Sequence, residues 1–215
     1  MSRLLAAVLL SAAAFAANAG SLQVSVVDKE GKPVADAVVV LVPSAGGLPR
    51  QALPTRVTIN QEKMRFVPAV SLVAVGGKGN FVNNDPWAHH VRGSPAGALE
   101  FNKSGGGFEM LLDGKHEGKP PRSGEATFDK AGPVLLGCHL HASMRGHVYV
   151  SDSPWAALTG DEGTASFDAV PAGPVYVRVW QADQLIAVPP QQMTLTDAPA
   201  RTTVNLTVVP RRRRL

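Results

Sequence analysis

Short apolar runs that alternate with polar residues, separated by turn residues, limit the folds open to this chain. The stretch "SLQVSVVD" places Leu22, Val24 and Val26 on one face, and "TTVNLTVV" near the end alternates in the same way. Such alternation is typical of half-buried β-strands, because successive side chains point to opposite faces. Gly and Pro, 21 and 17 in number, lie between these runs. The sequence therefore predicts an all-β protein built as sandwiches, with at most short helical turns, for example around "SPWAALTG".

The two ends of the chain look like halves of one domain. "VSVVDKEGKPVADAVVVLVP" and "GDEGTASFDAVPAGPVYVRVWQ" together resemble the carboxypeptidase regulatory-like, transthyretin-like sandwich family. The resemblance rests on turn residues and strand positions: Asp28, Gly31, Pro33, Ala37, Val38, Gly163, Phe167, Val170, Pro171, Gly173 and Tyr176. It implies a small immunoglobulin-like β-sandwich from residues 20–49 and 156–209, with residues 50–155 inserted as a second domain. The alternative is one larger sandwich with unusual connections.

The first residues are typical of a secretory signal peptide. Arg3 precedes an apolar run, and "ANA" supplies the small residues expected before a cleavage site. We expect residues 1–19 to be removed and the mature protein to be exported to the periplasm without a membrane span. The alternative is that this segment stays as a membrane anchor.

The positive charge of the chain is concentrated at its ends. Five of the 21 basic residues are Arg3 and the run Arg211–Arg214, so the remainder is close to neutral against 17 acidic residues. No basic stripe with interleaved aromatics appears, which argues against nucleic acid as a partner. The tail 210–215 is interpreted as a solvated end. The alternative is an electrostatic handle for an acidic partner or an anionic lipid surface.

The single cysteine lies in the stretch "CHLHASMRG". A lone cysteine excludes an intrachain disulfide, and a free thiol in an exported protein is stable only if it is buried or bound. Cys138, His141 and Met144 lie on one predicted loop between two strands, and "NNDPWAHHVRG" offers a second imidazole from His89 or His90. Two imidazoles, a thiolate and a weak thioether are the ligands of a blue-copper electron-transfer site. The alternatives are a buried free thiol and a closed zinc site, although methionine is a poor zinc ligand.

The segment from about Leu53 to Val150 resembles the cupredoxins of the plastocyanin/amicyanin group. Its C-x2-H-x2-M spacing is that of the short amicyanin loop, and "NNDPWAHHV" matches the motif of the group's first histidine ligand. The resemblance implies a Greek-key sandwich with one type 1 copper per chain, bound by His89, Cys138, His141 and Met144. It also implies a redox protein partner, and a link to amine oxidation, because amicyanins accept electrons from methylamine dehydrogenase.

The chain departs from that group at two positions. His90 stands where an asparagine normally follows the first ligand, and Leu140 stands where proline commonly precedes the second histidine. His139 should point away from Cys138. His90 and His139 are therefore either residues at the surface or next to the ligands, or part of a second metal site. His116 and His147 are predicted to be ordinary surface residues.

These observations favour a one-electron carrier that is not an enzyme and has no catalytic residues. The main alternative is a periplasmic copper-binding, delivery or sensing protein without an electron-carrier role. A multicopper enzyme would need a further substrate-binding copper beside the blue one.

Overall fold

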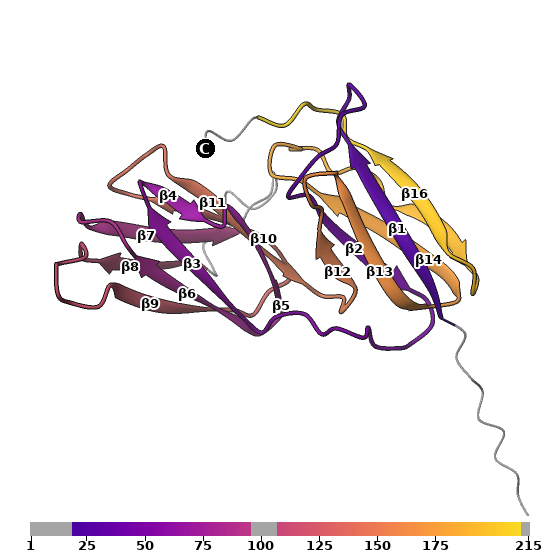
Figure 1. Cartoon of the computed structure of the whole chain (residues 1–215), viewed down its shortest axis with the longest axis horizontal. Coiled ribbons are helices and arrows are strands. Elements are labelled where there is room, and N and C mark those ends of the chain that lie inside the picture. Colours follow the sequence, from indigo (N-terminus) through magenta and orange to yellow (C-terminus); the bar gives the residue numbers. More distant parts are fainter. Residues whose placement is uncertain (1–18, 96–106, 212–215) are drawn as a thin grey trace, which may run out of the picture.

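A computed structural model describes residues 19–95 and 107–211 (Figure 1). Sixteen strands form four sheets, and no helix occurs in the described ranges, so the predicted all-β class is confirmed. The predicted signal peptide lies outside the described residues apart from Ala19, and the tail is described only as far as Arg211. Among the residues described, no helix is long and apolar enough to cross a membrane.

Strands from both ends of the chain share two sheets. The three-stranded sheet has the order β13-β1-β16 and the four-stranded sheet the order β12-β2-β14-β15. Their bounds are β1 Ala19–Val27, β2 Val38–Pro43, β12 Ala156–Leu158, β13 Thr164–Pro171, β14 Gly173–Trp180, β15 Gln191–Leu195 and β16 Ala200–Asn205. Because β1 pairs with β13 and with β16, the start and the end of the chain are joined by backbone hydrogen bonds.

Strands from the middle of the chain form the other two sheets. These have the orders β5-β11-β10-β7-β8 and β4-β3-β6-β9. Their bounds are β3 Arg56–Glu62, β4 Arg65–Val67, β5 Val70–Ala74, β6 Gly77–Asn83, β7 His89–Pro95, β8 Phe108–Leu112, β9 Arg122–Phe128, β10 Gly132–Cys138 and β11 Arg145–Ser151. We call this pair of sheets the middle sandwich and the other pair the terminal sandwich.

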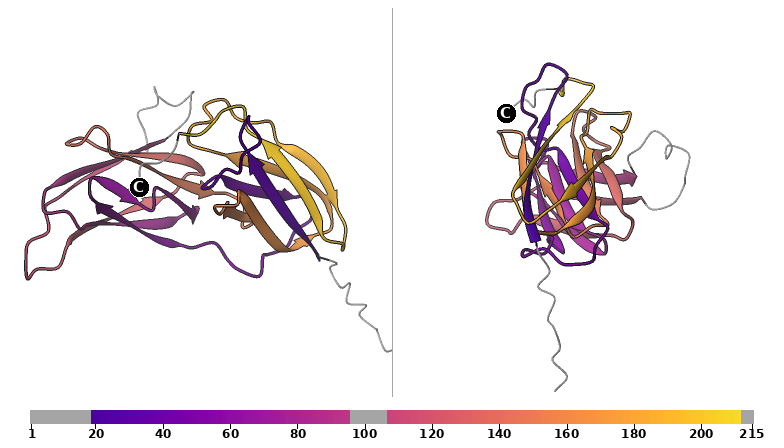
Figure 2. Two further views of the ribbon diagram at one scale, coloured as in Figure 1. Left: turned by 45° about the horizontal axis from the view of Figure 1, so that its top comes forward. Right: turned by 90° about the vertical axis from the view of Figure 1, so that its right-hand side faces the viewer.

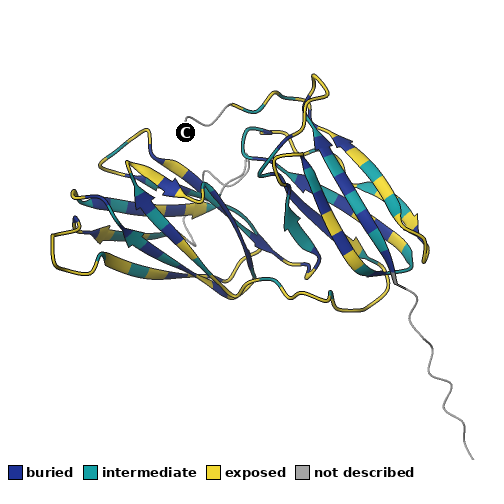
Figure 3. Cartoon of the chain, viewed as in Figure 1, coloured by how far each residue is buried: buried dark blue, intermediate teal, exposed yellow. Residues whose placement is uncertain are grey.

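Each sandwich has its own apolar core between its two sheets. The alternation read from the sequence appears as alternating buried and exposed residues along the strands (Figure 3). Leu22, Val24 and Val26 all lie in the core of the terminal sandwich. Ile59, Phe81 and Leu136 lie in the core of the middle sandwich, together with Cys138 and Met144.

A third apolar cluster joins the two sandwiches. Val38 and Val40 of β2 pack with Val70 and Leu72 of β5, and Trp180 also packs against this cluster. The two sandwiches lie end to end in an elongated molecule in Figure 1 and in the left view of Figure 2. Because β2 buries both of its faces, one in its own sandwich and one here, its continuous run of valines is explained.

One local prediction was wrong. The stretch "SPWAALTG" forms no helical turn: Ala156–Leu158 is β12, which pairs antiparallel with β2. The reason is tertiary, because Trp155 is buried in the core of the terminal sandwich and its carbonyl accepts a hydrogen bond from the Leu41 N–H.

Candidate metal centre

Neighbouring strands of the middle sandwich bring the predicted ligands to one end of a sheet. Cys138 is the last residue of β10 and pairs with Val91 of β7, two residues after His89. β10 and β11 are antiparallel neighbours, so the loop 139–144 returns over the same end. The sheet register therefore holds His89 and Cys138 side by side, and the loop adds His141.

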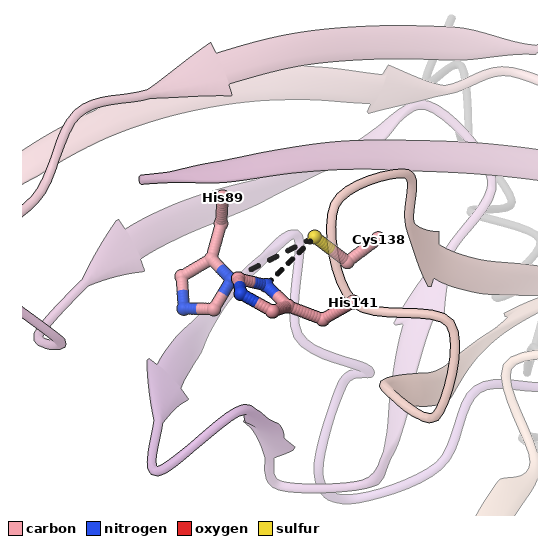
Figure 4. Close-up of side chains that lie close together, drawn as sticks. All are labelled: His89, Cys138 and His141. Carbon is pink, nitrogen blue, oxygen red and sulfur yellow. Dashed lines mark hydrogen bonds between the residues drawn. The ribbon is translucent and has the colours of Figure 1, made fainter. Parts of the chain in front are cut away.

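Three nitrogen and sulfur atoms converge at this end (Figure 4). Cys138 Sγ lies 3.7 Å from His89 Nδ1 and 3.5 Å from His141 Nδ1, and the two Nδ1 atoms lie 3.1 Å apart. His89 and Cys138 are buried and His141 is half-buried. These are the only three residues among those described whose His, Cys or carboxylate atoms gather closely enough to hold one ion.

The spacing and chemistry of these atoms fit a metal ion. Three donors about 2.0 to 2.3 Å from a shared ion, the usual range for imidazole and thiolate ligands, lie about 3.5 to 4.0 Å apart when they surround it in a plane. A bound cation would offset the lone pairs of a cysteine sulfur and two imidazoles that face one another in a buried position. Soft sulfur with imidazole favours copper or zinc over the oxygen-binding cations.

Met144, the last residue of the same loop, is the candidate for a weak fourth ligand. Its side chain is almost fully buried in the same core cluster as Cys138. Its backbone N–H donates to the His141 carbonyl, so the loop closes in a tight turn that holds residues 141 and 144 together. His89, Cys138, His141 and Met144 thus form a candidate type 1 copper site.

Asp85 contacts the His89 ring on the side opposite to the converging donor atoms. The sequence analysis did not identify Asp85 as part of the site. Its Oδ2 lies 2.9 Å from His89 Nε2, and both side chains are buried. Since a carboxylate only accepts, Nε2 is the ring nitrogen that donates to Asp85, and this leaves Nδ1 as the nitrogen directed at Cys138 and His141. The only signal in the sequence is an aspartate four residues before the first histidine.

Asp85 is itself fixed by the turn that connects β3 to β4. Its two oxygens accept the backbone N–H groups of Lys63, at 2.6 Å, and Met64, at 2.9 Å. Both residues have positive φ, the conformation of a tight hairpin turn. Burial raises the pKa of Asp85, but the Met64 N–H, the His89 ring and the Lys63 N–H together lower that pKa below its usual value. The carboxylate is therefore ionised at neutral pH.

A buried asparagine shapes the segment that leads to the first ligand. The Asn83 side-chain amide donates to the carbonyls of Trp87, Leu112 and Asp113, and its Oδ1 accepts the Asp85 N–H. These bonds tie residues 84–88 to the end of β8. A chain Asn83–Asp85–His89 of buried polar groups thus leads to the converging donor atoms.

The two histidines that the sequence left without an assigned role, His90 and His139, lie together on the outer face of the five-stranded sheet. Their ring centroids are 5.4 Å apart, and the His139 N–H donates to the His90 carbonyl. Arg92 Nη1 lies 3.3 Å from His139 Nε2, and Glu109 is 3.6 Å from His90 Nε2. His139 is exposed and points away from buried Cys138, as predicted. The pair does not share an ion-binding geometry with a third described residue.

The remaining histidines differ from each other. His116 is exposed, as predicted. His147 is half-buried, and its ring packs 5.3 Å from that of Trp180, so the prediction of an ordinary surface residue was wrong for it. It lies where β11 faces the terminal sandwich, which the order of strands along the chain does not reveal.

Comparison with known proteins gives a partial likeness. No protein family and no curated protein matches the sequence. The oxidised form of an amicyanin mutant is 16% identical, with 53% of this chain and 98% of that chain covered and a TM-score of 0.35. Amicyanin from Paracoccus versutus is 18% identical, with 52% and 97% covered and a TM-score of 0.35. A purple cupredoxin from Nitrosopumilus maritimus is 17% identical, with 44% and 98% covered and a TM-score of 0.35. The likeness spans about half of the chain.

Proposed function

We propose that this protein is a one-electron carrier with a single copper ion bound by His89, Cys138, His141 and Met144. The observation that carries the proposal is the convergence of His89 Nδ1, Cys138 Sγ and His141 Nδ1 within 3.1 to 3.7 Å of one another. A bound copper ion supplies one-electron chemistry between its two common oxidation states. The protein's part is to hold the donors in one geometry that suits both states.

The surroundings of the donor atoms support the proposal that the protein holds them in one fixed geometry. His89 is fixed by Asp85, and Asp85 by two backbone N–H groups, so this ligand has little freedom to move. Cys138 is the end of a strand paired on both sides, with β7 and β11. His141 is the ligand on the loop, and it is half-buried where His89 has no exposure, so we assign electron entry and exit to its ring edge.

We propose further that residues 50–155 form an inserted cupredoxin domain and that the protein works after export. The sorting of strands into two sandwiches supports the first part, and the signal-like residues 1–19 support the second. The short C-x2-H-x2-M loop supports an amine-oxidising enzyme as the electron source, since amicyanins share that spacing. The test of this last part is whether methylamine together with methylamine dehydrogenase reduces the copper-loaded protein.

Titration of the metal-free protein with Cu(II) tests the copper proposal. An intense visible charge-transfer band should grow to an end point at one ion per chain, and Cys138→Ser should abolish the band. His139→Ala is the matched control, since it removes a neighbouring histidine that does not face the donors, and it should keep the band. A colourless complex, or a band that survives Cys138→Ser, would contradict the proposal.

A further inference from the structure

The loop between β8 and β9 gathers basic side chains around a small cavity. Gly114, His116, Lys119, Pro120 and Arg122 line this cavity, whose volume is about 120 Å³. Lys119 and Arg122 are exposed, and neither forms an ion pair with a residue that the structure describes. A cavity lined by charges of one sign concentrates counter-ions. It has room for a carboxylate group with bound water, since one water takes about 30 Å³.

This loop begins beside the candidate metal centre. It follows Leu112, the last residue of β8, which pairs with His89 of β7. The Lys115 N–H donates to the Asp85 carbonyl at 2.7 Å, and Asp85 is the residue whose carboxylate contacts the His89 ring. The basic loop is therefore bonded directly to the segment that holds the first of the converging donor atoms.

The turn between β3 and β4 adds another basic side chain. The Asp85 carboxylate accepts the N–H groups of Lys63 and Met64, so this turn and the β8–β9 loop meet at Asp85. Lys63 is exposed and forms no ion pair within the described ranges. We call the basic surface the set of Lys63, Lys115, His116, Lys119 and Arg122.

An exposed indole lies beside the basic surface. A Cβ added at Gly114 would lie 2.2 Å from the Pro86 carbonyl oxygen, so the loop backbone is in contact with the segment that carries Trp87. Trp87 is 42% exposed, and its carbonyl is held by the side-chain amide of Asn83. Tryptophan is among the residues that contribute most to the affinity of protein–protein interfaces. An indole on a fixed backbone beside basic side chains favours a protein as the partner.

We propose that the basic surface docks an acidic face of a redox protein, with a partner carboxylate in the β8–β9 cavity and Trp87 packed against that face. The redox identity of the partner rests on the proposed electron-carrier function. Complementary charge speeds the encounter of two proteins and fixes their orientation. Docking here would bring the partner beside Asp85 and His89, at the end of the middle sandwich where the donor atoms converge.

The pattern of charge favours a protein over a nucleic acid or an anionic bilayer. Exposed Asp113 and Glu117 lie in the same loop as the basic residues, and Glu62 and Arg65 offset each other as paired residues of the β3–β4 hairpin. Four lysines and arginines against these two exposed carboxylates leave a net charge of about +2. Evenly spaced phosphates would be repelled by the two carboxylates, whereas a protein face can place basic side chains opposite them.

Binding of a fluorescently labelled polyglutamate peptide to the metal-free full chain tests the docking site without copper. In every protein Arg211–Arg214 are replaced by glutamine, so that the terminal run does not compete; this chain is the parent. At low salt, fluorescence anisotropy should show binding about tenfold weaker for Lys63→Gln/Lys115→Gln/Lys119→Gln/Arg122→Gln, because four exposed ion pairs are lost. High salt should remove most of the difference.

Matched controls separate the basic surface from charge in general. The charge control Lys29→Gln/Arg50→Gln/Lys130→Gln/Arg201→Gln removes four basic side chains from other exposed positions. It should bind polyglutamate within about twofold of the parent. A DNA oligonucleotide and phosphatidylglycerol vesicles serve as competing probes. Each should bind the parent and the quadruple variant of the basic surface within about twofold of one another.

Oxidation of the Cu(I)-loaded chain by ferricyanide tests whether the basic surface lies where electrons leave. The rate constant for this anionic oxidant should fall about tenfold in the quadruple variant at low ionic strength, and less than about twofold in the charge control. The cationic oxidant tris(phenanthroline)cobalt(III) should instead react faster with the quadruple variant, because repulsion is removed.

Different failures have different meanings. Equal polyglutamate binding by the parent and the quadruple variant would overturn the docking site, and so would an equal loss in the charge control. A larger loss of DNA or vesicle binding than of polyglutamate binding would assign the surface to one of those partners instead. Unchanged ferricyanide rates despite weaker polyglutamate binding would overturn the redox identity of the partner. A chain that binds no copper would overturn the proposed electron carrier, while the polyglutamate result would still decide the acidic docking site.

Discussion

The two sandwiches of this protein use buried polar groups in different ways. In the terminal sandwich, buried Asp28 accepts two backbone N–H groups of its own turn, while buried Gln184 and Thr159 bond to backbone groups of segments distant in sequence. In the middle sandwich, Asn83 and Asp85 form a chain that ends on His89 and the converging donor atoms. Both sandwiches bury polar groups, but among the described residues only the middle sandwich directs them at a set of atoms that could bind a metal.

This contrast explains why the candidate metal site lies in the middle sandwich. Buried polar groups are costly unless every one has a partner, and a polar chain that is fully bonded is rigid. The terminal sandwich uses its buried polar groups to hold turns and neighbouring segments beside a core of Val, Leu and Phe. The middle sandwich instead carries one partly open end, at which an ion held by His89, Cys138 and His141 would complete the network. Substitutions in each sandwich test this division, and they are ordered here by the size of their effect.

Leu41→Ala should affect folding but not the metal. Leu41 is fully buried in the core of the terminal sandwich, so the substitution should lower the free energy of unfolding by about 2 to 5 kcal/mol. Urea denaturation followed by circular dichroism measures the loss. In native buffer the copper band should stay unchanged. A folded variant without the band would show that the metal site depends on the core of the terminal sandwich.

Asp85→Asn should weaken metal binding by about 10- to 100-fold, because the partner of a metal-binding imidazole tunes its basicity and orientation. Competition with a chromophoric chelator measures the affinity. Asp28→Asn is the control: Asp28 is the other buried aspartate, but it accepts the N–H groups of Glu30 and Lys32 in a turn of the terminal sandwich. Equal affinities for the two variants would remove Asp85 from the site.

The metal-free protein should lose stability in acid partly through Asp85. Its pKa is lowered in the folded state, so its contribution is present above the usual aspartate pKa and is lost as the pH falls through the folded value. Urea denaturation of the metal-free protein between neutral pH and acid should show a smaller loss for Asp85→Asn than for the unaltered chain. An identical dependence on pH would contradict the bonding around Asp85.

Met144→Leu conserves volume and should cost less than about 1.5 kcal/mol in stability. If Met144 is the weak fourth ligand, the reduction potential and the copper band should still shift, since the axial ligand tunes both. Met193→Leu, on β15 of the terminal sandwich, should change neither. A potential unchanged by Met144→Leu would leave only three ligands.

His139→Ala should have the smallest effect, within about 0.5 kcal/mol of unfolding free energy, because the side chain is exposed. One copper per chain should still bind. Metal analysis that finds two ions in the unaltered chain and one in this variant would revive the second metal site at His90 and His139.

The sequence predicted the strands and the candidate metal ligands better than the hydrogen-bond partners that fix these ligands and strands in place. Alternating valines and the C-x2-H-x2-M spacing are local patterns, so β1, β2 and the loop after Cys138 could be read directly. Asp85 could not, because its role depends on the turn at Lys63 and Met64, which is distant in sequence. β12 was missed for the same reason: three residues become a strand only by pairing with β2.

X-ray absorption at the copper edge of the loaded protein gives the plainest test of the copper site. It reports the atoms bound to the ion without reference to any partner. We expect one copper per chain with one short thiolate sulfur bond and two imidazole nitrogens, and loss of the sulfur in Cys138→Ser. A copper bound by nitrogen and oxygen alone in the unaltered chain would contradict the proposed site.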